Sequence, residues 1–108
     1  MSYNIIATPK FRKELKKLVK KYHSLISEYE KLLDQLENNA SLGEPLGMDC
    51  FKIRMSIASK NKGKSSGAGV ITYVYYAKET VFLIDIYDKG NQANISNKEL
   101  FELLKHIK

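Results

Sequence analysis

Apolar residues recur along this chain with two different periods, and the change of period predicts where its helices and strands lie. After Thr8 and Pro9 they fall three or four positions apart, which is typical of an amphipathic helix. The two residues mark its start, because a threonine hydroxyl caps free amide groups and proline suits the first turn. A second stripe predicts a helix from Ser24 or Ser27 to Asn38, so an antiparallel helical hairpin is expected.

Two serine–glutamate pairs have the three-residue spacing of a capping box, in which each side chain bonds the other residue's amide. Ser27 and Glu30 form the first pair and indicate a start for the second helix. Ser96 and Glu99 form the other, at the beginning of a C-terminal helix predicted within residues 95–108.

Beyond the hairpin the period changes to two. Phe51 and Ile53 alternate with Lys52 and Arg54, which predicts a half-buried strand. Its apolar residues should face the helices, and the two basic residues should leave together from the opposite face. β-branched and aromatic residues indicate the other strands. The predicted strands cover residues 3–7, 50–59, 70–77 and 80–90.

Strict alternation along the last strand predicts that Ile84 and Ile86 share one face of the sheet. Leu83, Asp85 and Tyr87 are then expected on the other face.

The resulting order is β-α-α-β-β-β-α, in a single domain of residues 1–108. Asn, Gly and Pro residues predict a loop at 38–47 between the hairpin and the strands. An α+β fold is expected, with an antiparallel meander sheet and the helical hairpin packed on one face.

Composition agrees with a small globular domain, since 44% of the 108 residues are hydrophobic. Cys50 is the single cysteine, so no disulfide forms within the chain and a reducing cytoplasm is expected. No run is apolar enough to span a membrane, and the start of the chain lacks the pattern of a signal peptide. No membrane partner is expected.

Basic residues outnumber acidic ones by 18 to 12, giving a net charge of +6 that favours an anionic partner. They gather in residues 10–21 and 50–64, and the first helix therefore carries a basic face. A large anion such as ribosomal RNA is a candidate partner for this face. Its candidate RNA-binding residues are Lys13, Lys16, Lys17 and Lys20.

Recognisable catalytic motifs are lacking. His23 and His106 do not form a metal pattern, and we find no nucleophile motif, P-loop or dinucleotide fingerprint. Neither a metal nor a small-molecule cofactor is predicted.

The basic face of the predicted sheet is the remaining candidate site. Lys52 and Arg54 lie side by side on one strand, and Tyr87 and Lys89 end another. Such a face can hold an RNA backbone, and tyrosines can stack on bases. It can also be a solvated sheet surface. Three lysines stand on the adjoining loop, namely Lys60, Lys62 and Lys64.

RNA brings its own nucleophile, the 2′-hydroxyl, so positioned cations can promote cleavage without a histidine or carboxylate. A lysine crowded by other cations has a lowered pKa and can transfer protons.

Three stretches resemble toxins of the RelE/ParE superfamily, nearest the RelE- and HigB-like branch of bacterial type II toxin–antitoxin modules. They are ATPKFRKELKKL, DCFKIRMSIASKNKGKSSGAGVITY and FLIDIYDKGNQANIS. The middle stretch combines a K-x-R strand, a loop rich in lysine and glycine, and a following strand.

The resemblance implies an endonuclease that enters the ribosomal A site and cuts mRNA there, by 2′-hydroxyl attack and without a metal. It implies a cognate antitoxin as partner and no cofactor. By this resemblance the catalytic residues are Lys52, Arg54, Lys64, Tyr87 and Lys89, and Lys60 and Lys62 bind RNA.

Gly69 departs from the pattern, because the relatives usually have an arginine there that stabilises charge on the phosphate. Loss of one such cation costs roughly 10²–10³ in rate. An attenuated toxin is one interpretation, and a glycine bend at the entry of a strand is the other.

Two further functions stay open. One is a non-enzymatic inhibitor like the ParE branch, which acts on DNA gyrase. The other is a degenerate toxin that binds its antitoxin as a corepressor.

Overall fold

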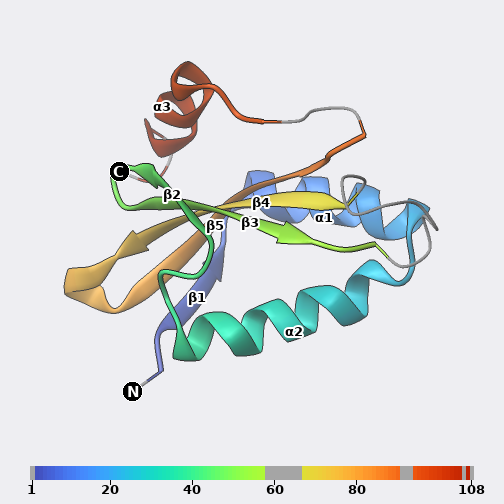
Figure 1. Cartoon of the computed structure of the whole chain (residues 1–108), viewed down its shortest axis with the longest axis horizontal. Coiled ribbons are helices and arrows are strands. Elements are labelled where there is room, and N and C mark those ends of the chain that lie inside the picture. Colours follow the sequence, from blue (N-terminus) through green and yellow to red (C-terminus); the bar gives the residue numbers. More distant parts are fainter. Residues whose placement is uncertain (1, 58–66, 91–93, 106, 108) are drawn as a thin grey trace.

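The computed structural model describes residues 2–57, 67–90, 94–105 and 107. Within them one five-stranded sheet lies between a helical hairpin and a C-terminal helix (Figure 1). The elements are β1 (Asn4–Ala7), α1 (Pro9–Lys21), α2 (Leu25–Asn38), β2 (Glu44–Gly47), β3 (Cys50–Met55), β4 (Ala68–Tyr75), β5 (Thr80–Asp88) and α3 (Asn97–Lys105). A 3₁₀ turn at Tyr76–Lys78 joins β4 to β5.

The sheet has the order β1-β5-β4-β3-β2, with β1 parallel to β5 and every other pair antiparallel. The predicted α+β class, the hairpin and the meander are therefore confirmed. The loop prediction for 38–47 is wrong in its second half, where β2 pairs with β3. Pro45 obscured this strand, because proline is tolerated at a sheet edge but argues against a central strand.

Two of the three predicted helix-capping signals are confirmed. The Thr8 hydroxyl accepts a hydrogen bond from the Phe11 amide at 3.3 Å. The Ser96–Glu99 capping box is also present, with both reciprocal bonds between 3.1 and 3.2 Å. The Ser27 box is wrong, because α2 begins at Leu25 and includes Ser27.

Two apolar clusters lie on opposite sides of the sheet. The cluster under the α1–α2 hairpin includes Phe11, Leu36 and Ile53. The cluster under α3 includes Ile71, Ile84 and Leu100. Figure 1 shows the same division, with the hairpin and α3 on different sides of the strands. The sheet is thus covered on both faces.

Strict alternation fails in β5. Leu83 and Ile86 belong to the hairpin cluster, whereas Ile84 and Tyr87 belong to the α3 cluster. The prediction that Ile84 shares a face with Ile86 is therefore wrong. The cause is an irregularity in the pairing, since the β4–β5 register shifts between Ile71 and Thr72.

Two phenylalanines on helices provide a matched test of the packing. Phe11 is fully buried under the hairpin, and Phe101 is 53% exposed on α3. We expect Phe11→Ala to lower the free energy of unfolding by about 3–5 kcal/mol. Phe101→Ala should change it by less than about 0.5 kcal/mol. Urea unfolding measures both, and equal losses would contradict the assignment of the core.

Candidate nucleic-acid interface

A row of three residues crosses the sheet on the α3 side. Arg54 of β3 pairs in register with Gly69 of β4, and Gly69 pairs with Tyr87 of β5. In the next row Lys52 is opposite Ile71, which belongs to the α3 cluster. Register partners point to the same face, so the predicted basic pair does lie together on the side away from the hairpin.

Lys52 is held in place by the segment that leads into α3. Its residue is 8% exposed, and its Nζ donates a hydrogen bond to Asn94 Oδ1 at 2.7 Å. The partner is a neutral amide, so the lysine charge is not cancelled. Arg54 is exposed. In the described part of the chain, neither cation forms an ion pair with a carboxylate.

Lys89 joins this pair from the end of β5, where its amide donates to the Gly67 carbonyl at 3.0 Å. Burial, and then the charges of Arg54 and Lys52, lower the pKa of Lys89 below its usual 10.5, while Glu44 acts in the opposite direction. These couplings show that Lys52, Arg54 and Lys89 share one electrostatic environment. The two cations therefore contribute to the shift at Lys89, after burial.

Tyr87 is 8% exposed, and its hydroxyl is buried and has no hydrogen-bond partner among the described residues. Burial, and then the charges of Asp85 and Glu99, raise the pKa of Tyr87 above 10.0, while Arg54 opposes them. The phenol is therefore neutral near pH 7. A neutral phenol can donate a hydrogen bond, but a hydroxyl buried in this way does not face a substrate.

Gly69 lies under the tip of the Tyr87 ring. A Cβ built on Gly69 would stand 2.5 Å from Tyr87 Cζ and 2.7 Å from its hydroxyl oxygen. Such distances are far below van der Waals contact, so a side chain at position 69 requires the ring to move. The gap expected at Gly69 is thus filled by a tyrosine from the neighbouring strand.

Asp85 and Asn94 are site residues that sequence reasoning missed. Asp85 is 8% exposed and forms an ion pair with Lys10 of α1, with 2.9 Å between Asp85 Oδ1 and Lys10 Nζ. A charged residue inside the apolar run of β5 was a signal that the buried carboxylate has a partner of opposite charge. No local signal pointed to Asn94, because its bond to Lys52 is made only by the folded chain.

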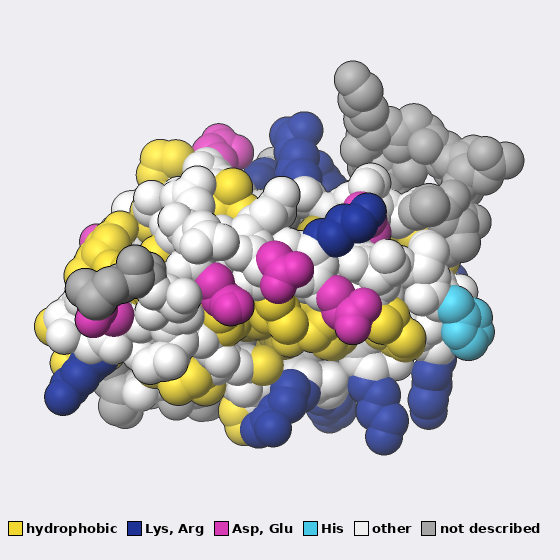
Figure 2. Space-filling model, turned by 90° about the horizontal axis from the view of Figure 1, so that it is seen from below, with side chains coloured by type: hydrophobic (Ala, Val, Ile, Leu, Met, Phe, Trp, Pro, Cys, Tyr) yellow, Lys and Arg dark blue, Asp and Glu magenta, His cyan; other side chains and the backbone are white. Residues whose placement is uncertain are grey.

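The four predicted lysines of α1 are all exposed, although Lys17 makes a 3.6 Å ion pair with Glu14. Lys and Arg side chains form a row along one edge of Figure 2, and Asp and Glu side chains form another across its middle. A depression of about 350 Å³ is lined by Lys17 and Lys21 together with Tyr87 and Asp88. The basic surface of α1 therefore adjoins the end of β5. The predicted loop residues Lys60, Lys62 and Lys64 lie outside the described residues.

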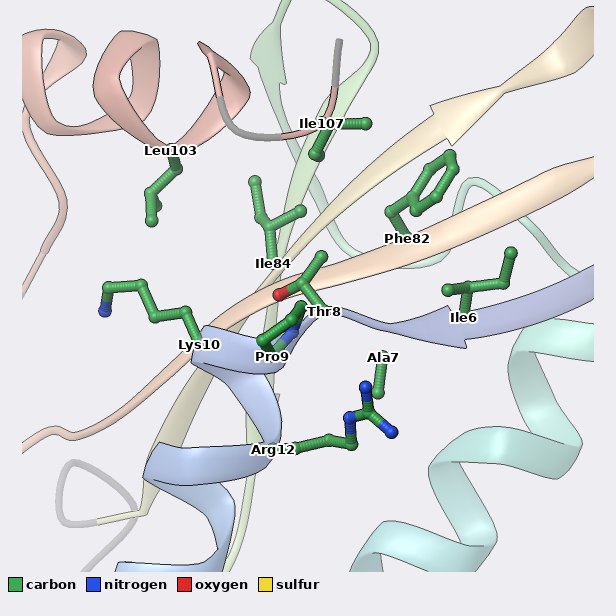
Figure 3. A pocket seen from close by; sticks show the side chains of 10 residues that line it. All are labelled: Ile6, Ala7, Thr8, Pro9, Lys10, Arg12, Phe82, Ile84, Leu103 and Ile107. Carbon is green, nitrogen blue, oxygen red and sulfur yellow. The ribbon is translucent and has the colours of Figure 1, made fainter.

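A separate cavity of about 550 Å³ lies between the start of α1 and α3. Figure 3 shows its lining, which is mainly apolar and includes Ile6, Phe82 and Leu103. Lys10 and Arg12 are its charged members. The residues of the cross-sheet row do not line it, and an apolar wall suits a side chain better than a phosphate.

None of the described helices is both long and apolar enough to cross a membrane. In the described residues we also find no group of three or more His, Cys, Asp or Glu residues arranged to hold a metal ion.

Comparison with known proteins identifies the fold of this chain. No family model matches this sequence, and no curated protein does. A mutant of the E. coli toxin RelE in the free state superposes with a TM-score of 0.66 at 23% identity, covering 100% of both chains. The chain has the RelE fold. The isolated E. coli RelE toxin gives a TM-score of 0.62 at 24% identity, over 99% of this chain and 100% of that one.

The RelE fold also recurs in the E. coli RelBE toxin–antitoxin complex. That match has a TM-score of 0.61 at 24% identity and covers 81% of this chain and 96% of the other. The predicted RelE-like architecture is therefore confirmed.

The charge coupling at Lys89 can be measured directly. Arg54 lowers the pKa of Lys89, so Arg54→Gln should raise that pKa toward 10.5. NMR titration of methylated lysines would follow the change, with Lys89→Arg used to assign the signal. Arg12→Gln removes the same charge from α1 and should leave the pKa of Lys89 unchanged. An unchanged Lys89 pKa in Arg54→Gln would show that the two side chains are not coupled.

Proposed function

We propose that this chain is the toxin of a type II toxin–antitoxin module and cleaves mRNA in the ribosomal A site. The observation that carries the proposal is the convergence of Lys52, Arg54 and Lys89 on one face of a RelE-like sheet, beside Tyr87. Three cations on a sheet face suit a ribose-phosphate chain.

The proposed reaction uses the nucleophile of the RNA. The 2′-hydroxyl attacks the adjacent phosphorus, the bond to the 5′-oxygen breaks, and a cyclic phosphate and a 5′-hydroxyl end result. Arg54 is free to stabilise the negative charge that develops on the phosphate oxygens. Lys52, oriented by Asn94, holds the backbone in line. Lys89, with its lowered pKa, is the residue of this set assigned to proton transfer.

Tyr87 and Lys64 complete the proposed catalytic set. Tyr87 orients the RNA or donates a proton when its hydroxyl faces the substrate. Lys64, in the sequence between β3 and β4, adds a further cation.

Two macromolecular partners follow from this function. The ribosome is held by the basic face of α1 and by lysines between β3 and β4 in the sequence, through phosphate contacts. The contacts are assigned to Lys13, Lys16, Lys17, Lys20, Lys60 and Lys62. A cognate antitoxin neutralises the toxin, as the existence of the E. coli RelBE complex suggests. The module acts in the cytoplasm and needs no metal or cofactor.

Gly69 makes this toxin attenuated. It stands in the row between Arg54 and Tyr87, and the resemblance to RelE- and HigB-like toxins implies a further cation at this position. Without that charge the transition state is less stabilised, by roughly 10²–10³ in rate.

The buried hydroxyl of Tyr87 favours one alternative, a degenerate toxin that binds its antitoxin but does not cut RNA. A gyrase inhibitor is disfavoured, because a protein target does not require a cluster of phosphate-facing cations.

Cleavage is tested by primer extension on mRNA bound to purified ribosomes. The wild-type protein should produce cuts spaced by codons, and Arg54→Ala should lower their rate about 10²-fold or more. Lys31→Ala removes an exposed charge from α2 and should keep the wild-type rate. Lys16→Gln combined with Lys20→Gln should raise KM for ribosomes and leave kcat unchanged. Absence of codon-spaced cuts with every protein would eliminate the nuclease.

Attenuation is tested by restoring the charge. Gly69→Arg should raise the cleavage rate by up to about 10²-fold and arrest growth when the gene is induced. Asn38→Arg adds the same charge at the exposed end of α2 and serves as the control. Equal gains in both variants would mean that net charge, not position 69, limits the activity.

A further inference from the structure

We propose that Gly69 is a positioning residue, because it leaves room for the Tyr87 ring to lie over β4. We call this position of the ring the seat, and in it the phenol hydroxyl is withheld from the RNA site. The inference rests on the proposed function for the role of Tyr87, and on the geometry for the seat itself. It differs from the loss of a cation, because it concerns where the tyrosine lies.

The seat exists because position 69 has no side chain. Gly69 and Tyr87 are register partners on adjacent strands, so their side chains would leave the same face next to each other. The three Tyr87 atoms nearest to a Cβ on Gly69 are Cζ, the hydroxyl oxygen and Cε2, at 2.5 to 2.8 Å. The tip of the ring thus lies across β4, directly over the glycine.

In this position the hydroxyl cannot contact a substrate. Tyr87 is 8% exposed, and its oxygen is buried with no hydrogen-bond partner in the part of the chain that the structure describes. Leu100 and Leu103 of α3 belong to the same apolar cluster as the ring, which explains why it stays on the sheet. A tyrosine that acts on RNA must therefore leave the seat.

The seat holds the ring better than it holds the hydroxyl. Aromatic rings stabilise glycines in sheets by covering the exposed backbone. A buried hydroxyl with no hydrogen bond destabilises the position in which it is buried. The ring is therefore retained by packing, whereas its polar end gains by moving to a phosphate oxygen or to water.

Any side chain at position 69 should displace the tyrosine, even without a charge. The atoms that a Cβ would meet belong to the far end of a rotatable side chain, so the backbone does not have to move. Gly69→Ala isolates this steric effect from the added cation of an arginine.

The first measurement is the accessibility of Tyr87, which does not depend on activity. The full chain is nitrated with tetranitromethane, and each tyrosine is followed by peptide mass spectrometry. Tyr75 and Tyr76, which are 42% and 47% exposed, serve as internal references. In the wild type Tyr87 should react severalfold more slowly than either. In Gly69→Ala the nitration rate of Tyr87 should approach the rates of Tyr75 and Tyr76. The variant should still show a thermal unfolding transition.

The second measurement is cleavage on ribosomes. Gly69→Ala should cut faster than the wild type, and the gain should disappear in Gly69→Ala combined with Tyr87→Phe. The phenylalanine keeps the ring and removes only the hydroxyl, so a purely structural role of the ring would not produce this loss.

Several outcomes would overturn the inference. An unchanged nitration rate of Tyr87 in Gly69→Ala, or an unfolded variant, would show that the ring does not yield. A faster nitration with slower cleavage would show that the seated tyrosine is the productive one, and the nuclease would still stand. Faster nitration with no cleavage by any variant would support the seat and refute the proposed function.

Discussion

The pairing of β4 with both of its neighbours is the constraint on which the candidate site depends. Arg54 and Tyr87 come from strands that do not touch each other, and β4 separates them by one residue, Gly69. Because register partners share a face, the hydrogen bonds of the sheet bring these residues into one row. A slip by one residue would turn Gly69 to the hairpin side and disperse the row.

The irregularity between β4 and β5 is part of the same constraint. The register shift near Ile71 changes the phase of β5, so that Asp85 stands opposite Ile71 while Leu83 stands opposite Thr72. It leaves Tyr87 on the α3 side with Ile84. The irregularity therefore determines which β5 side chains meet the basic residues of β3.

Electrostatics explains why cations can gather here without unfolding the domain. Arg54 is solvated, and Lys52 is satisfied by the Asn94 amide. Asp85 is already paired with Lys10, and the acid that opposes the repulsion at Lys89 is Glu44. Burial, and then the repulsion from Arg54 and Lys52, lower the pKa of Lys89. The site is thus charged, and ready for an anion that supplies the missing negative charge.

The sequence by itself determined the local structure. The stripes of α1 and α2, the Thr8 and Ser96 caps, and the side-by-side placement of Lys52 and Arg54 depend on neighbours within four residues, so periodicity predicts them. The tertiary structure decided the rest. The ring of Tyr87 over Gly69, the bond from Lys52 to Asn94 and the strand β2 join segments far apart in the chain. They depend on strand register and packing, which no local pattern encodes.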